Sequence, residues 1–195
     1  YLKMKEENPD AILFYRLGDF YEMFFEDAKL VSQELDLVLT GRSAGVEEKV
    51  PMCGVPFHAA NSYIQRLVKK GYKVAICEQL EDPSTAKGLV DRGIIKIITP
   101  GTYMDAKSTN YMASCDVSSF EITVIYCELS TGELKYQTLQ RSLVALQKAL
   151  LEQNVSELVC PMTMDKKWMA ALEEMDTMLI SKHKKANIDP EDLPL

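Results

Sequence analysis

An aromatic-rich stretch, LGDFYEMFF at residues 17–25, has residue types that could contact a nucleic-acid base. Phe20 follows a Gly-Asp turn, which could project its ring beyond a sheet, and Glu22 points the same way if the backbone is extended. An exposed ring can wedge into a base stack, and a carboxylate can hydrogen-bond a base edge. In the alternative interpretation Phe20 belongs to the core and Glu22 is solvated. Spacing alone favours that alternative.

Other kinds of chemistry have little support in the sequence. It contains no G-x-x-x-x-G-K-[ST] phosphate loop and no G-x-G-x-x-G motif. The two histidines, His58 and His183, lie far apart, and the five cysteines include no C-x-x-C pair. We therefore expect no zinc site, no disulfide framework and a reducing compartment. No catalysis and no metal are predicted for this chain.

The net charge does not indicate a basic nucleic-acid module. The chain has 195 residues, of which 22 are basic and 29 acidic, for a formal charge of −7. Residues 1–106 contain 13 basic and 16 acidic residues, so neither half of the chain is basic. Because phosphate neutralisation supplies most non-specific affinity for DNA, a nucleic acid would have to meet a local patch. No apolar run approaches the ~20 residues that cross a bilayer, and the N-terminus suggests a fragment without a signal peptide.

Hydrophobic periodicity predicts an α/β arrangement in the first half of the chain. The clearest helix covers residues 59–70, with Tyr63, Ile64, Leu67 and Val68 on one face and Gly71 as its C-cap. The other predicted elements are a strand at 11–17, a turn at 18–19, a helix at 24–37, a strand at 38–40, a loop at 41–54, a strand at 72–77, a polar loop at 81–93, a strand at 94–99 and a linker at 103–109.

The second half opens with strands and predicts the order β-β-β-α-β-α-β. Its strongest strand signal is at 120–129, followed by a hairpin turn at 130–133. The remaining elements are a return strand at 134–139, a helix at 142–153, a strand at 155–159, a helix at 166–175, a strand at 178–181 and a loose tail at 187–195. This order is typical of a small layered α/β domain.

The runs FYRLGDFYEMFFEDA and VPMCGVPFHAANSYIQRLVKKGYKVAICEQLEDPSTAKGLVDRGIIKIITPGT closely resemble the N-terminal mismatch-recognition domain of the bacterial MutS mismatch-repair family. The resemblance is almost continuous from Tyr1 to Thr102. The later runs NYMASCD and CELSTGEL resemble the start of the family's connector domain. The resemblance implies a mixed-sheet α/β mismatch-binding domain at 1–106, followed by a partial RNase H-like α/β connector domain at 107–195.

The resemblance also implies roles for individual residues. Phe20 matches the family's phenylalanine, which enters the minor groove and stacks on a mispaired or unpaired base. Glu22 matches the glutamate that hydrogen-bonds this base, either by accepting from a base N–H or, when protonated, by donating to a ring nitrogen. Its charge could also penalise binding to perfect duplex by repulsion. Further positions that match family residues near the duplex are Arg42, Met52, Lys87 and Arg92.

Alternatives remain open for these supporting residues. Arg42, Lys87 and Arg92 could be exposed charges without a ligand, and Met52 could fill the core. Gly41 stands where the family often has a second basic residue, and acidic Glu47-Glu48 follow. This departure predicts weak phosphate binding by the chain alone.

For the whole protein the resemblance implies ATP and Mg²⁺ as cofactors, an ATPase outside this chain, a homodimer and a cytoplasmic location. It also implies mismatched double-stranded DNA and a MutL-type partner, the latter docking on the connector. One rival interpretation is an RNase H-like nuclease using Asp116 and Glu128, which lack the further carboxylates such an enzyme needs. The other is a module that only docks a protein partner.

Overall fold

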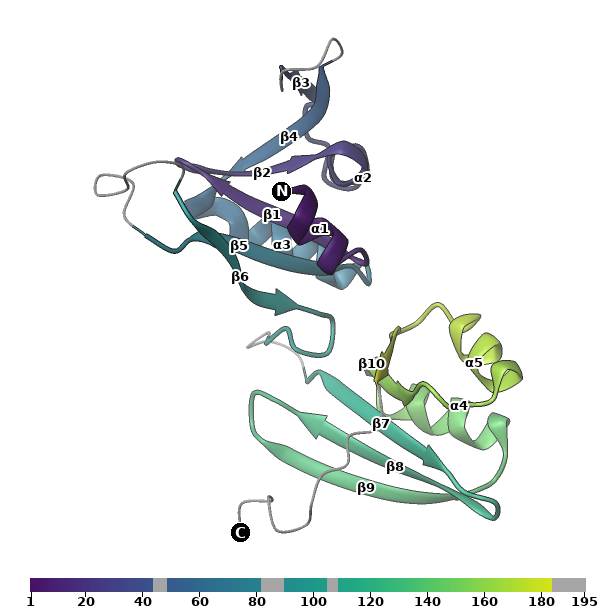
Figure 1. Cartoon of the computed structure of the whole chain (residues 1–195). Coiled ribbons are helices and arrows are strands. Elements are labelled where there is room, and N and C mark those ends of the chain that lie inside the picture. The colour runs from purple at the N-terminus through teal and green to yellow at the C-terminus, as the bar shows by residue number, and fades with distance from the viewer. Residues whose placement is uncertain (44–48, 82–89, 105–108, 184–195) are drawn as a thin grey trace. The chain divides into compact units, whose positions relative to one another are not determined.

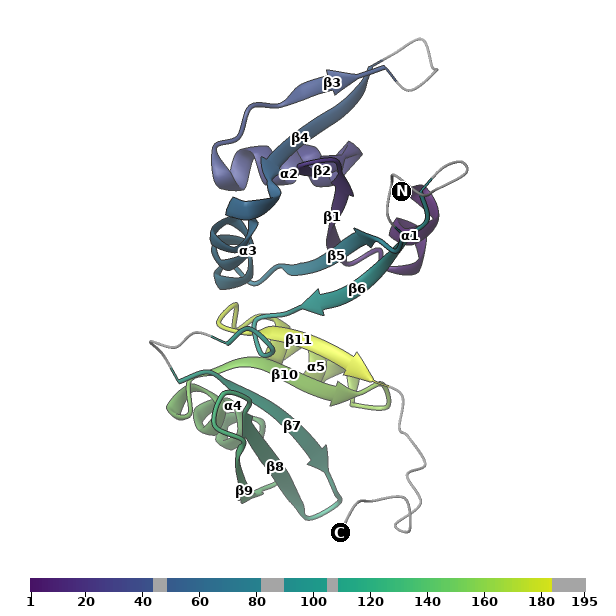
Figure 2. The same ribbon diagram turned by 90° about the vertical axis from the view of Figure 1, so that its left-hand side faces the viewer.

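The structure is a computed structural model that describes residues 1–43, 49–81, 90–104 and 109–183. It divides into two compact units, Tyr1–Tyr103 and Met104–Leu195, and each contains one β-sheet with helices (Figures 1 and 2). Within the described residues, no helix is long and apolar enough to cross a membrane.

The first unit is built on a six-stranded sheet in the order β3-β4-β2-β1-β5-β6. The central strands β1 and β5 are parallel, and the other neighbours are antiparallel. The strands are β1 Ala11–Leu17, β2 Phe20–Phe24, β3 Thr40–Arg42, β4 Val50–Pro56, β5 Lys73–Gln79 and β6 Arg92–Ile98. The helices are α1 Leu2–Glu7, α2 Phe25–Leu35 and α3 Ala60–Lys69, with a 3₁₀ turn η1 Phe57–Ala59 before α3.

The main core of this unit lies between the sheet and helices α2 and α3. Ile64, Leu67 and Val68 have the spacing of one helix face and are buried there, as predicted. Gly71 follows α3 with a φ of +90°, a conformation that glycine adopts without strain. The alternate strand residues, whose side chains point to the other face of the sheet, pack against Met4 of α1. Figures 1 and 2 show α1 and α3 on opposite sides of the sheet. We call the side that carries Ala11 and Phe20 the α1 face.

The predicted loop at 41–54 is wrong at both ends, where residues belong to the strands β3 and β4. Residues 50–56 form β4, which pairs with both β2 and β3. Prolines and a glycine occur within β4, and such residues are depleted in strands, so its local sequence resembles a loop. The predicted strand at 38–40 is also displaced, because the observed strand is 40–42 and Val38 is exposed. Pairing with distant strands decides both segments.

The second unit contains a five-stranded sheet in the order β11-β10-β7-β8-β9, with β7, β10 and β11 parallel. Its elements are β7 Tyr111–Val117, β8 Glu121–Glu128, β9 Glu133–Gln140, α4 Leu143–Glu152, β10 Val155–Pro161, α5 Lys166–Glu173 and β11 Leu179–His183. The predicted order β-β-β-α-β-α-β is confirmed. Both helices join one core cluster, and Gln147 of α4 donates to the carbonyl of Ala171 in α5 at 3.2 Å. The predicted tail at 187–195 lies outside the described residues.

Candidate nucleic-acid interface

Phe20 stands at the start of β2, immediately after a two-residue hairpin loop. Gly18 has a φ of +57°, which suits the tight connection between β1 and β2. Phe20 lies opposite Leu17 on one side and Pro56 on the other. The amide of Phe57 donates to the carbonyl of Asp19 at 2.9 Å and ties the loop to the end of β4. Phe20 is 47% exposed and does not belong to the main core cluster.

Glu22 lies on the same side of β2 as Phe20. The strand alternates, because Tyr21 and Met23 are buried in the main core while the residues between them face the other way. The extended backbone on which the sequence argument depended is therefore present. Glu22 lies opposite Tyr15 on β1 and Gly54 on β4. A Cβ added at Gly54 would lie 3.5 Å from Cγ of Glu22, so glycine leaves the space beside this carboxylate open.

Arg42 and Met52 lie on the α1 face as well. Met52 is opposite Phe24 on one side and Thr40 on the other, and Arg42 is opposite Val50. Residues directly opposite each other share a face of the sheet, which places these side chains with Glu22. Met52 is half-buried and outside the main core cluster. An ion pair joins Arg42 Nη1 to Glu22 Oε2 at 2.5 Å, a contact that the sequence analysis did not predict.

Arg92 reaches the same face from β6, but its guanidinium already has partners. Nε donates to the carbonyl of Arg16 at 3.0 Å, and Nη1 donates to the carbonyl of Val90 at 3.0 Å. The guanidinium carbon lies 5.4 Å from the ring centroid of Tyr15, which is directly opposite Glu22. A DNA contact by Arg92 stays a prediction, and this residue also braces the strands. Lys87 lies outside the described residues.

A cluster on the opposite face supports the hairpin that carries Phe20. Arg16 Nε donates to the carbonyl of Gly18 at 2.6 Å, and its guanidinium carbon lies 3.8 Å from the ring centroid of Phe57. The hydroxyl of Tyr21 donates to Glu78, whose carboxylate lies 3.8 Å from Arg16. Burial, and then the bond to Glu78, raises the pKa of Tyr21 to about 12. The sequence signal for this cluster was Arg16, a charged residue within an apolar strand and two positions before the glycine of the turn.

Residues 41–45, GRSAG, match the G-x-S-x-G pattern of a nucleophile elbow, although no such elbow was expected from the sequence. In such an elbow the serine stands on a sharp turn between a strand and a helix. Here Gly41 and Arg42 belong to β3, and the next described element is the antiparallel strand β4. The context of an elbow is therefore not present in the described part of the chain.

The side chains of the α1 face suit binding by stacking, hydrogen bonds and charge. The face presents an exposed aromatic ring, a carboxylate and a half-exposed guanidinium close to one another. Among the described residues, no group of three His, Cys, Asp or Glu side chains could hold a metal ion. Four of the five thiols are buried, and burial raises the pKa of Cys53 and of Cys77 to about 11.

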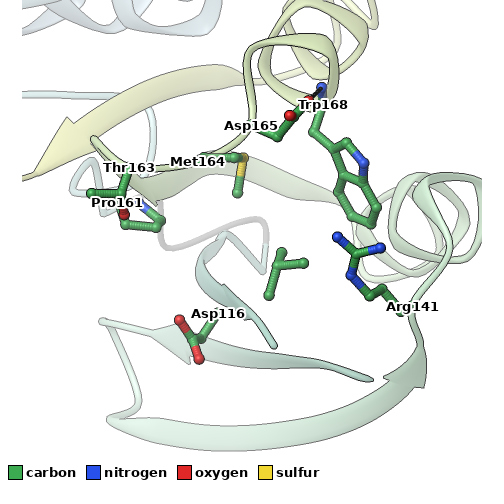
Figure 3. A pocket seen from close by; sticks show the side chains of 8 residues that line it. Asp116, Arg141, Pro161, Thr163, Met164, Asp165 and Trp168 are labelled. Carbon is green, nitrogen blue, oxygen red and sulfur yellow. Dashed lines mark hydrogen bonds between the residues drawn. The ribbon is translucent and has the colours of Figure 1, made fainter. Parts of the chain in front are cut away.

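The second unit has a recess of about 240 Å³ at the carboxyl ends of β7 and β10 (Figure 3). Arg141 lies beside the indole of Trp168, with the guanidinium carbon 5.8 Å from the ring centroid. Arg141 Nε also donates to the carbonyl of Ser118 at 3.0 Å. Asp165 caps α5 by accepting from the amide of Lys167 at 2.8 Å. The residues that line the recess are Asp116, Val117, Arg141, Pro161, Thr163, Met164, Asp165 and Trp168.

Glu128, one of the two carboxylates of the nuclease interpretation, has a structural role. It accepts hydrogen bonds from the amides and hydroxyls of both Ser130 and Thr131 in the β8–β9 turn. These bonds, with those from the Thr131 and Ser130 hydroxyls largest, lower the pKa of Glu128 to about 2. A carboxylate engaged in this way is occupied in closing a turn, which disfavours a role as a metal ligand.

Fold and site together define a mixed-sheet α/β module that carries an exposed phenylalanine, a carboxylate and a guanidinium on one face of its sheet. Residues 1–107 match the family model described as MutS domain I, and the chain belongs to this family. It is 53% identical over 171 residues to "DNA mismatch repair protein MutS" of Clostridium botulinum (strain Loch Maree / Type A3) and to the protein of the same name of Clostridium beijerinckii. Each alignment covers 80% of this chain and 18% of the relative, so the chain spans under a fifth of the length of these relatives.

Proposed function

We propose that this part of the protein recognises mispaired or unpaired bases in duplex DNA during mismatch repair. The observation that carries the proposal is the placement of Phe20 and Glu22 on one face of β2, with Phe20 47% exposed. In this mechanism Phe20 enters the minor groove and stacks on the base, and Glu22 hydrogen-bonds it. The relatives are named DNA mismatch repair proteins, and this name supports a role of the chain in mismatch repair.

The physical basis is the lower stiffness of DNA at a mismatch. Stacking and pairing are weakened there, so inserting a ring and bending the duplex costs less than in matched DNA. A protein that reads deformability can accept many different mispairs, because it does not depend on one donor and acceptor pattern. Phe20 would supply the stacking energy that is common to all mispairs, and Glu22 would add a hydrogen bond to the base itself.

The charge of the chain predicts weak binding. The net charge is −7, and of the cations predicted at the interface Arg92 is already hydrogen-bonded to the backbone. Few phosphates can then be neutralised, so measurable affinity requires low salt. Homodimer formation and ATP with Mg²⁺ are proposed for the whole family protein, and the chain has no phosphate-loop motif that fits ATP. The residues of this chain are therefore assigned no step with that cofactor.

The proposal is tested by titrating a labelled duplex with one G·T pair or one unpaired T, beside the matched duplex, at low salt. We expect the chain to prefer the heteroduplex and Phe20→Ala to lose the preference, because base–aromatic stacking contributes about 1–3 kcal/mol. Phe120→Ala is the control, since Phe120 is 89% exposed in the second unit. A folded chain without any preference would contradict the proposal for this chain.

Docking of a MutL-type partner by the second unit is a second candidate. The recess that joins Trp168 to Arg141 favours it, because Trp and Arg are enriched at the energetic centres of protein interfaces. A module that only docks would bind the partner in a pull-down and ignore the heteroduplex in a gel shift. Arg141→Ala should then weaken the pull-down and leave DNA binding unchanged.

A further inference from the structure

The carboxylate proposed to contact the base already has a partner in the free protein. Oε2 of Glu22 lies 2.5 Å from Nη1 of Arg42, a charge-assisted contact between two strands that are not neighbours in the sheet. Glu22 is opposite Gly54 and Arg42 is opposite Val50, so the ion pair extends along β4 on the α1 face. While this contact persists, Oε2 is occupied and the charge of Arg42 is neutralised.

The two members of the pair differ in their access to solvent. The side chain of Arg42 is 49% exposed, whereas that of Glu22 is 17% exposed. An anion that approaches the α1 face therefore meets the guanidinium before it meets the carboxylate. The anions that a DNA duplex presents are its backbone phosphates, and a guanidinium binds phosphate as well as carboxylate through paired N–H donors.

We propose that Arg42 determines specificity by exchanging its partner, releasing Glu22 and taking a phosphate of the duplex. This inference rests on the proposed function and deepens it. On matched DNA Arg42 gains a phosphate, but the released Glu22 finds no base to contact, so the loss of its partner is not compensated. At a mismatch the same carboxylate gains a hydrogen bond to the exposed base. The ion pair therefore weakens binding to matched duplex more than binding to the heteroduplex.

A double-mutant cycle on matched duplex separates this exchange from simple repulsion of DNA by Glu22. The four proteins are the unaltered chain, Glu22→Gln, Arg42→Gln and the double variant, titrated at low salt. Glu22→Gln frees Arg42, so it should tighten binding to matched duplex. If Arg42 must first leave Glu22, this gain should be about two- to fivefold larger with Arg42 present than with Arg42→Gln, as for an exposed ion pair.

The salt dependence of DNA binding supplies a second readout. It would not change if Arg42 only held Glu22 in place and made no contact with a phosphate. Loss of a phosphate contact should reduce the slope of log affinity against log salt by about 1 in Arg42→Gln. The matched control is the pair of Lys29 and Glu26 on α2, joined at 2.7 Å, in which the lysine is as exposed as Arg42 and the carboxylate is more exposed than Glu22. Lys29→Gln, Glu26→Gln and their double variant should show no coupling towards DNA.

Each outcome decides between the two proposals. A larger gain in the presence of Arg42, together with the reduced slope, supports the exchange. Equal gains in both backgrounds, or an unchanged slope, would refute it, and a heteroduplex preference in the unaltered chain would leave the proposed function standing. If neither duplex binds at the lowest salt, the proposed function fails for this chain and the exchange fails with it.

Discussion

The alternation of β2 predicts opposite consequences for two neighbouring large side chains. Met23 is fully buried in the main core, whereas Phe20 is 47% exposed on the α1 face. Met23→Ala should destabilise the fold by about 2–5 kcal/mol, because it removes buried atoms and leaves a cavity. With a urea slope of about 1–3 kcal/mol per molar, the midpoint should fall by roughly 0.7–5 M, or about 2 M for mid-range values of both quantities.

Phe20→Ala should have a much smaller effect on stability. Complete burial of such a side chain contributes about 1.5–3 kcal/mol, and roughly half of the ring is covered, so the expected loss is about 1 kcal/mol. Urea unfolding followed by circular dichroism measures both variants. Phe120→Ala, at 89% exposure, is the control and should change the unfolding free energy by less than about 0.5 kcal/mol.

The reasoning is refuted if Phe20→Ala is as destabilising as Met23→Ala. That result would place the Phe20 ring in the core and would support the alternative interpretation that spacing alone favoured. Folded Met23→Ala should keep the preference for the heteroduplex, whereas Phe20→Ala should lose it. This contrast is expected because the two side chains lie on opposite faces of β2.

Two further predictions concern carboxylates with structural roles. Asp27→Ala should destabilise the first unit by about 1–3 kcal/mol in urea, since buried Asp27 accepts from Lys5 Nζ at 2.8 Å and from the Leu13 amide at 3.0 Å; an unchanged midpoint would contradict this. The lowered pKa of Glu128 stabilises the fold above about pH 4.5, and this contribution disappears as the pH falls towards about 2. In Thr131→Val that loss should shrink, as measured by Trp168 fluorescence in urea at pH 5 and 2.5, and an identical pH dependence would be inconsistent with it.

The local sequence was sufficient for the elements that present Phe20. The strand 11–17 and the Gly-Asp turn were predicted at the observed positions, because an apolar run followed by a glycine turn is a short-range signal. The helix at 60–69 and the element order of the second unit were predictable for the same reason. Hydrophobic period and turn chemistry depend on residues only a few positions apart.

The interface itself depends on pairing between distant parts of the chain. The local composition of residues 50–56 resembles a loop, yet these residues form β4 because they pair with β2 and β3. In the sheet, β4 lies between the strand that carries Phe20 and the strand that carries Arg42. The ion pair of Glu22 and Arg42 joins residues 20 positions apart. The hydrogen bond from Arg92 to the carbonyl of Arg16, 76 positions away, likewise follows from the sheet.

The sequence by itself determined which residues are proposed for base contact, the turn before Phe20 and the family to which the chain belongs. Only the tertiary structure decided that Glu22 is held by Arg42, that Arg92 is engaged, and that an arginine on the opposite face supports the hairpin. The physical reason is register: a shift of one residue in a strand moves every side chain to the other face. Register is set by the whole sheet, whereas turn and strand signals are local.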